Sequence, residues 1–399
     1  MIRSAAAGVL VASLLPGAAG ARQTPTPSPA PTVQTPKEVT ATELAAAIDT
    51  LGSFDFATRT DAARTVRRAP AALAIPALAK AARAHAEGYV RYRALVLLAG
   101  FGDANARDTM RAVMSDANDR LRGVVYEWFE RHPDPEILPA LLDALAHETS
   151  EFVRPPLIRA VAAHRDDARA KQVLLPLVMR GEDFFRGAVI TALGDYRAGF
   201  AAASIADVAR LEGPLQDDAV TALGRIGDPA HIATLLEVRK TAPAGVQPTI
   251  AAALCLLGAD CNVHEPQVRD TLTKAIAEGQ QPIVRGASHA MAMLAIANRP
   301  GALSGLFDRG VAAADPARAA IALSTGLVAL RNAGAVLDVL EARADQEAAI
   351  ELLRDAFDML SEDFEEECFY MDVRRAYWAA APGSARQKVA EALIRILEF

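Results

Sequence analysis

A pattern of about 31 residues recurs along this chain and constrains its fold more than any other feature. In each copy an apolar residue precedes an arginine or a glutamine, here called the anchor, and an apolar run with helical spacing follows. The anchors are Arg91, Arg122, Arg154, Arg186, Gln216, Gln247, Arg285 and Arg318, separated by 31, 32, 32, 30, 31, 38 and 33 residues. Weaker copies near Arg59 and Ile350 extend the series to about ten units.

Each unit has the pattern of two helices joined by a turn. Apolar residues recur three, six and seven positions after the anchor, as in Ala94, Leu97 and Leu98, so they share one helix face. An aspartate stands twelve residues after four of the anchors, where it can accept hydrogen bonds from the free amides at a helix start. These aspartates are Asp103, Asp134, Asp166 and Asp228. Since so short a helix pair cannot bury its own apolar face, the pattern predicts an all-α fold, an α-solenoid of stacked pairs.

The stretch VTALGRIGDPAHIATLLEV, residues 220–238, combines the offset, the cap and the period of the repeat. It resembles the short HEAT-like repeat first known from phycobilisome lyases, and the resemblance extends over residues 42–360. The resemblance implies a right-handed superhelix of about ten helix pairs, of an exported bacterial type. It implies little about function, because proteins with such repeats include scaffolds, adaptors and a few enzymes.

The two ends of the chain differ from the repeats. Residues 1–21 have the positive start, apolar run and small-residue end of a signal peptide, with cleavage predicted after Ala21. Residues 22–40 form a tether rich in proline and threonine, 41–360 the solenoid, and 361–399 an acidic and aromatic cap. We therefore expect a periplasmic or secreted protein, with an uncleaved N-terminal membrane anchor as the alternative. The mature chain has no further apolar stretch of membrane-spanning length.

The composition narrows the function classes. The net charge of −7 at pH 7 argues against a nucleic-acid partner, which would require a basic surface. The seven histidines never stand three or four residues apart, so the sequence predicts no helical metal site. It also contains no nucleophile elbow, phosphate loop or dinucleotide fingerprint. We expect no catalytic residue, no metal and no cofactor.

The three cysteines allow two interpretations. In an oxidising compartment Cys255 and Cys261 can form a local disulfide; the alternative is a buried structural thiol at Cys255. Cys368 is unpaired in either case. The longest step between anchors, 38 residues, falls in this region, and its extra residues around 259–266 predict a longer turn.

The anchor arginines and the capping aspartates are predicted to form a structural ladder between units. In similar repeats the anchor arginine meets an acidic group of the preceding turn. Asp116 precedes Arg122 in this way, and Glu148 precedes Arg154. Half-exposed pairs of this kind fix register more than they stabilise; a row of arginines that binds a ligand is the alternative. The ladder residues are Arg91, Arg122, Arg154, Arg186, Arg285, Arg318, Asp103, Asp134, Asp166 and Asp228.

The two ends of the predicted solenoid carry opposite charge. Residues 59–93 contain eight basic and two acidic side chains, whereas residues 341–367 contain eleven acidic and two basic ones. One interpretation is a pair of solvated caps whose aromatic residues seal the last unit. The other is that the acidic end binds a basic partner or the basic end of another copy, in head-to-tail association. The partner-binding candidates are Glu365, Glu366, Glu367, Phe369, Tyr370 and Trp378.

These features predict an exported scaffold that binds a protein partner through its concave face or its charged ends. We expect the second helix of each unit to line the concave face. The alternative function is an enzyme or a lyase-like protein with a pocket on that face, which would require titratable groups to converge there. The second helices, such as residues 231–240, show no such convergence.

Overall fold

The computed structural model describes residues 38–102, 106–299, 301–360 and 363–399. These residues form 22 α-helices and two short 3₁₀ helices, with no β-strand among them. The predicted signal peptide and nearly all of the predicted tether lie outside the described residues. The prediction of an all-α solenoid is confirmed.

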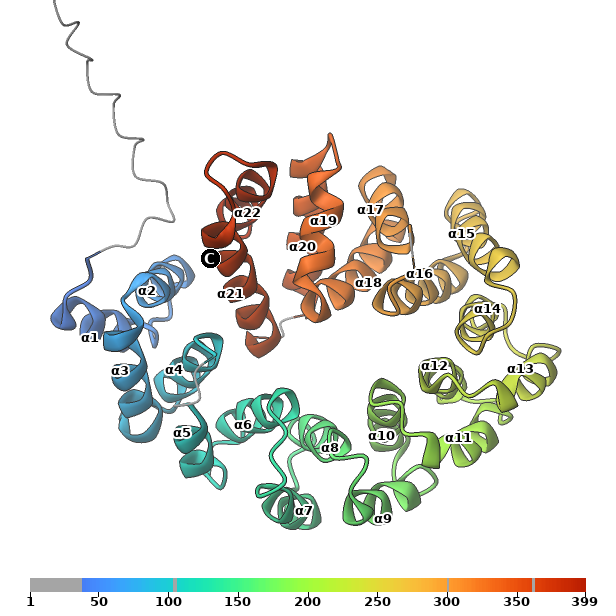
Figure 1. Cartoon of the computed structure of the whole chain (residues 1–399), viewed down its shortest axis with the longest axis horizontal. Coiled ribbons are helices and arrows are strands. Elements are labelled where there is room, and N and C mark those ends of the chain that lie inside the picture. The colour runs from blue at the N-terminus through green and yellow to red at the C-terminus, as the bar shows by residue number, and fades with distance from the viewer. Residues whose placement is uncertain (1–37, 103–105, 300, 361–362) are drawn as a thin grey trace, which may run out of the picture. The chain divides into compact units, whose positions relative to one another are not determined.

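The helices form two layers within one unit that spans residues 36–399 (Figure 1). The inner layer consists of α4 (Gly88–Gly100), α6 (Asp119–Arg131), α8 (Arg154–Ala162), α10 (Asp183–Asp195), α12 (Gln216–Ile226), α14 (Gln247–Leu256), α16 (Gln281–Ile296), α18 (Ala317–Arg331) and α20 (Gln346–Leu360). The outer layer consists of α3 (Ala71–Ala84), α5 (Ala106–Val113), α7 (Leu138–His147), α9 (Ala168–Leu177), α11 (Ala202–Ala209), α13 (Ile232–Val238), α15 (Cys261–Ala277), α17 (Ala302–Ala312) and α19 (Ala333–Glu341). The 3₁₀ helices η1 (Gly199–Ala201) and η2 (Pro229–His231) precede α11 and α13.

Two helices flank these layers at each end. The helices α1 (Ala41–Thr50) and α2 (Phe56–Arg68) come before them, and α21 (Asp363–Ala379) and α22 (Ala385–Ile396) follow them. Each inner helix packs on the next one along the series, so the buried core runs continuously from repeat to repeat. This is the shared core that the repeat predicted.

The inner layer is built from the first helix of each unit, not from the second helix as we expected (Figure 1). The first helices carry small residues where they meet. A Cβ on Gly194 of α10, for example, would lie only 2.6 Å from the Cα of Ala222 on α12. Because small contact residues allow a shorter distance between helix axes, the layer of first helices is the more closely spaced one, and the solenoid curves towards it.

The predicted helix caps are confirmed at two positions. The carboxylate of Asp228 accepts a hydrogen bond from the amide of Ala230 (3.0 Å), and Asp134 accepts one from the amide of Glu136 (3.0 Å). The cap of α9 is Asp167, one residue later than the predicted Asp166. Asp103 lies outside the described residues. A one-residue shift in the cap leaves the two-helix unit unchanged, because helix starts vary by that much between repeats.

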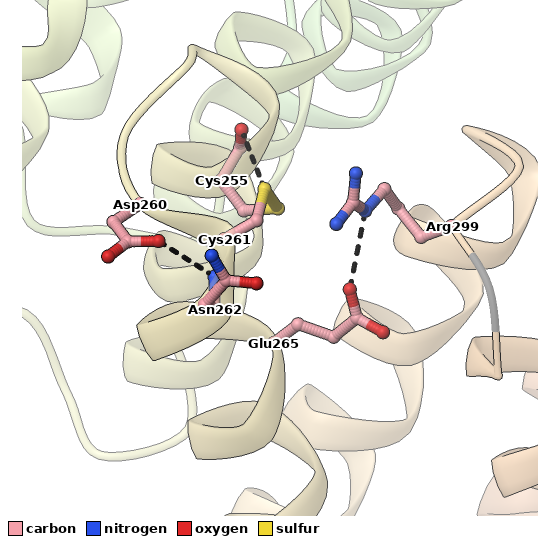
Figure 2. The surroundings of a disulfide bond; sticks show 6 residues. All are labelled: Cys255, Asp260, Cys261, Asn262, Glu265 and Arg299. Carbon is pink, nitrogen blue, oxygen red and sulfur yellow. Dashed lines mark hydrogen bonds and ion pairs between the residues drawn. A yellow bond between two sulfur atoms is a disulfide. The ribbon is translucent and has the colours of Figure 1, made fainter.

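The 38-residue step contains a longer outer helix in place of the longer turn that we expected. The extra residues belong to α15, which runs for 17 residues and begins at Cys261 after its cap, Asp260. Figure 2 shows the disulfide that joins Cys255, near the end of α14, to Cys261. Glu265 on the first turns of α15 pairs with Arg299 at 3.3 Å. The disulfide therefore links an inner helix to the outer helix that follows it.

No single helix in the described ranges is long and apolar enough to cross a membrane. The neighbours α18 and α19 reach that length and composition only together, and they are bent by 116° where they meet.

Candidate binding surfaces on the inner layer

The anchors close the ends of the preceding outer helices. Each anchor side chain donates a hydrogen bond to a carbonyl group at or just beyond the last turn of that helix, where carbonyls lack a helical partner. Six anchors do this: Arg91 to Ala82, Arg122 to Asp116, Arg186 to Val178, Gln216 to Ala209, Gln247 to Arg239 and Arg318 to Gly310. This shared role explains why glutamine can replace arginine at the anchor.

The ladder of ion pairs is present, but it is shifted by one repeat. Asp116 binds the guanidinium of Arg91, and Glu148 binds that of Arg122 at 2.8 Å. Each acidic residue thus pairs with the anchor of the unit before it, whereas we expected the anchor just after it. Arg154 instead lies over the ring of Phe185, 3.8 Å from its centroid.

The remaining anchors vary. Arg186 pairs with Asp183 at 2.9 Å and Arg318 with Asp355 at 2.7 Å, whereas Arg285 is exposed. Since most of these side chains are already engaged within the solenoid, they do not form a free row for a ligand.

The basic and the acidic ends of the solenoid meet within one molecule. Helix α21 packs against α4, and Glu367 accepts hydrogen bonds from Arg67 on α2. Asp363 pairs with Arg93 at 2.8 Å, and Gly100 accepts a hydrogen bond from Arg375 at 3.0 Å. We refer to these contacts together as the end-to-end contact. It places the acidic helix on the inner layer of the first repeats.

Most of the six residues predicted to bind a partner lie inside this end-to-end contact. Glu367 and Phe369 are buried, Glu365 pairs with Arg131 on α6, and Tyr370 stacks on the ring of Phe399. Glu366 accepts a hydrogen bond from Tyr370 at 3.2 Å. Trp378 is 51% exposed. The opposite charges of the two ends are therefore used within the chain, which leaves little of this surface for a second copy.

A cavity of about 530 Å³ lies where the inner helices approach one another across the inner layer. Its charged wall joins helices that are far apart in sequence. Asp195 on α10 binds Arg159 of α8 at 2.6 Å and Arg331 of α18 at 2.9 Å, and it also binds Arg225 of α12. The apolar part of the wall comprises Pro155, Pro156, Ile296, Leu327 and Leu330.

A second carboxylate extends this network. Glu130 of α6 binds Arg159 at 2.5 Å and accepts a hydrogen bond from the hydroxyl of Tyr196 at 2.9 Å. Burial alone would raise the pKa of Asp195, but the guanidiniums of Arg225, Arg331 and Arg159 lower it below its ordinary value. Burial and the charge of Glu130 raise the pKa of Tyr196. These charged groups thus hold fixed protonation states at neutral pH.

A groove of about 470 Å³ crosses the first turns of α8, α10 and α12 and shares Pro155 and Arg159 with the cavity. Its surface is mostly apolar and includes Phe184, whose side chain is 68% exposed. Phe152 occupies the equivalent position one repeat earlier, two residues before the anchor, and is 88% exposed. Two adjacent repeats therefore present an aromatic ring to solvent at the same position. The rest of the groove consists of Asp183, Gly187, Ala188, Thr191, Pro214, Leu215 and Asp218.

Asp218 is the unusual residue of this groove. Within the described part of the chain its carboxylate has no hydrogen bond and no ion pair. Burial, and then the charge of the neighbouring Asp217, raise the pKa of Asp218 to about 6. One carboxylate oxygen of Asp217 is itself buried without a hydrogen-bond partner. The groove therefore combines an apolar surface with uncompensated negative charge.

Comparison with known proteins agrees with this architecture. Residues 75–162, from within α3 to the end of α8, match the HEAT-repeat family.

Residues 75–162 are HEAT repeats.

The solved structures that resemble the chain are also helical. A crystal structure of a Kap121p mutant has 13% identity and a TM-score of 0.43, covering 91% of this chain and 51% of its own. A structure concerned with the interaction between cadherin and beta-catenin has 12% identity and a TM-score of 0.29, with 90% and 95% covered. This chain thus spans about half the length of the Kap121p chain. At these TM-scores neither likeness bears on function. No curated protein matches the sequence.

Sequence reasoning missed the charged residues on the inner faces of the HEAT repeats. A signal for them exists: nine residues after the anchor, three units carry a charge, at Arg131, Asp195 and Arg225. The equivalent positions in other units are apolar or small, such as Leu256. A charge at a position that otherwise faces neighbouring helices indicates an ion pair between distant repeats, but the sequence does not show which repeats meet.

Proposed function

We propose that this protein is a scaffold that binds a protein partner in the groove across α8, α10 and α12. The observation that carries the proposal is the exposure of Phe184 in the wall of that groove. Exposed aromatic side chains beside an apolar depression are typical of protein-binding sites, because burying them in a complex releases free energy. The aromatic ring of Phe152 extends the same surface towards the preceding repeat.

The concave-face hypothesis is thereby narrowed to one part of the inner layer. The first repeats are covered by α21, and the cavity at the centre is crossed by ion pairs. The groove is the part of the inner layer where apolar surface meets solvent. The charged ends are less suited to binding a partner, because each already binds the other.

The alternative, an enzyme with a pocket on the inner layer, has one supporting observation: titratable groups do converge in the cavity, on the first helices. Their environment favours an ion-pair network over proton transfer. A general acid or base functions best with a pKa near the working pH, whereas the pKa values of Asp195 and Tyr196 are moved away from neutrality. We therefore favour the scaffold.

Export belongs to the same proposal. It rests on the signal-peptide pattern of residues 1–21. The disulfide between Cys255 and Cys261 supports it, because such bonds persist in oxidising compartments. Fractionation of cells, with N-terminal sequencing of the mature chain, tests this part: a protein that starts at Met1 in the cytoplasm would overturn it.

Site-specific photocrosslinking tests the binding surface. A benzoylphenylalanine at position 184 should give one discrete crosslinked product in the native cell-envelope fraction, and the unlabelled protein should compete for it. The same group in place of Val263, which is exposed on the outer helix α15, is the matched control. Products of equal yield from both positions, or none from position 184, would contradict the proposal.

A further inference from the structure

The groove across α8, α10 and α12 also indicates what kind of side chain it binds; this inference rests on the function proposed above. Its charges are unbalanced. Asp183 is paired with Arg186, and Arg159 is occupied by Glu130 and Asp195. Asp218 has no partner among the described residues, so it contributes a free negative charge to the groove.

The position of Asp218 in α12 does not account for this arrangement. A carboxylate in the first turn of a helix is favoured by the helix dipole, and Asp217 and Asp218 both lie there. The dipole does not require that two adjacent carboxylates be partly buried beside an apolar surface, where ionisation costs free energy. The same local preference could be met by an exposed carboxylate, as with Asp183 of α10.

We propose that the groove binds a partner segment in which a lysine or arginine stands next to an apolar side chain. The cation pairs with Asp218, and the apolar side chain packs on Phe184 between Pro155 and Pro214. The complex would thus supply the counter-charge that Asp218 lacks in the free protein. A cationic head on an apolar stem, as in lysine and arginine, suits a groove whose walls are apolar.

Selection from a phage library of random twelve-residue peptides tests this inference on the full chain. Wild-type protein at pH 7.5 should enrich sequences with a basic residue beside an apolar one. The Asp218→Asn variant should enrich apolar residues without the basic preference, and Phe184→Ala should enrich neither. A synthetic peptide of the wild-type consensus should bind Asp218→Asn about five- to tenfold more weakly than wild type. As a matched control, Asp207→Asn on the outer helix α11 should leave its affinity unchanged.

The outcomes separate the two proposals. Apolar sequences selected without basic residues, and lost in Phe184→Ala, would overturn the inference about the partner and leave the proposed function standing. Peptides that bind Phe184→Ala as well as wild type, or a library that enriches nothing, would overturn both. Because both substitutions lie on the surface of one groove, thermal unfolding of each variant shows that the comparison is made between folded proteins.

Discussion

Arg67 and Glu367, 300 residues apart in sequence, form a buried ion pair in which two nitrogens of the guanidinium bind the two oxygens of the carboxylate. The shortest nitrogen–oxygen distance is 2.6 Å, and the side chains are 5% and 2% exposed. The pair joins α2 to α21 at the end-to-end contact. Gly100 of α4 lies against it; a Cβ there would come within 2.7 Å of the Cγ of Glu367.

Removing one partner of this pair should destabilise the protein strongly. Glu367→Gln leaves the Arg67 guanidinium buried without its counter-charge, and we expect a loss of about 3 kcal/mol in the free energy of unfolding. The double variant Arg67→Met with Glu367→Leu should recover part of that loss, because it leaves no buried charge unpaired. Urea unfolding followed by circular dichroism measures both. A loss below about 0.5 kcal/mol for Glu367→Gln would show that the pair is accessible to water.

Reversing a charge in the end-to-end contact should separate α21 from the first repeats. Arg93→Glu places a carboxylate beside Asp363, where the native ion pair measures 2.8 Å. Small-angle X-ray scattering should then give a larger radius of gyration at low salt. Arg83→Glu on the outer helix α3 makes the same change of charge at an exposed position and should leave the radius unchanged. Equal radii for both variants would mean that apolar contacts alone keep α21 in place.

The thiol of Cys368 should report the same separation chemically. Burial raises the pKa of this thiol to about 12, so the reactive thiolate is scarce at pH 8. Alkylation by iodoacetamide, followed by mass spectrometry, should be slow in the wild-type protein. It should be at least tenfold faster in Arg93→Glu, since a solvated thiol has a pKa of about 8.5. Fast labelling of the wild type would contradict the burial of Cys368.

Asp218 should lower the stability of the free protein at neutral pH. Between pH 3.8, its ordinary pKa, and about 6, the folded protein retains a proton on Asp218 that the unfolded chain releases. Stability therefore falls as the pH rises through this interval and is lowest above it. Asp218→Asn should stabilise the protein by roughly 2 kcal/mol at pH 7.5 and hardly at all at pH 4. Melting temperatures at the two pH values measure this, and an equal gain at both would show that ionisation is not the cause.

The disulfide should stabilise the link between α14 and α15 only modestly. It closes a short loop between residues six positions apart, so the chain-entropy model gives about 2 kcal/mol. Replacing Cys255 and Cys261 by serine should therefore lower the melting temperature while leaving the helix content unchanged. Mass spectrometry after alkylation in denaturant should find Cys368 as the one labelled cysteine of the wild type. Labelling of all three would show that the bond is absent.

The sequence was most informative about local structure. The period, the apolar offsets and the caps at Asp134 and Asp228 are set by contacts within one unit or between neighbouring units, so their spacing is visible in the sequence. The shift of the ladder by one repeat was not visible, because Asp116 lies close in sequence to Arg122 and yet reaches back to Arg91. The pattern identified the acidic residue and left its partner among two neighbouring anchors.

Contacts between distant repeats were the harder part. Whether opposite charges at two ends meet within a chain or between chains depends on curvature, and curvature results from small differences in helix spacing at residues such as Gly194. The candidate groove was missed for a related reason. Phe184 and Asp218 lie in different units, and each alone fits an ordinary exposed ring or a residue in the first turn of a helix.

The end-to-end contact changes how such a fold can be made and lost. An open solenoid frays from its free terminal repeats, because each of these has only one neighbour. Here the first helices gain a second neighbour from residues that the ribosome adds some 300 positions later. Until α21 arrives, Arg67 has no counter-charge and the first repeats remain the weakest part of the nascent chain. Molecules cut or terminated before residue 363 would therefore share one vulnerable site, and early proteolysis at α1 and α2 would distinguish them from finished protein.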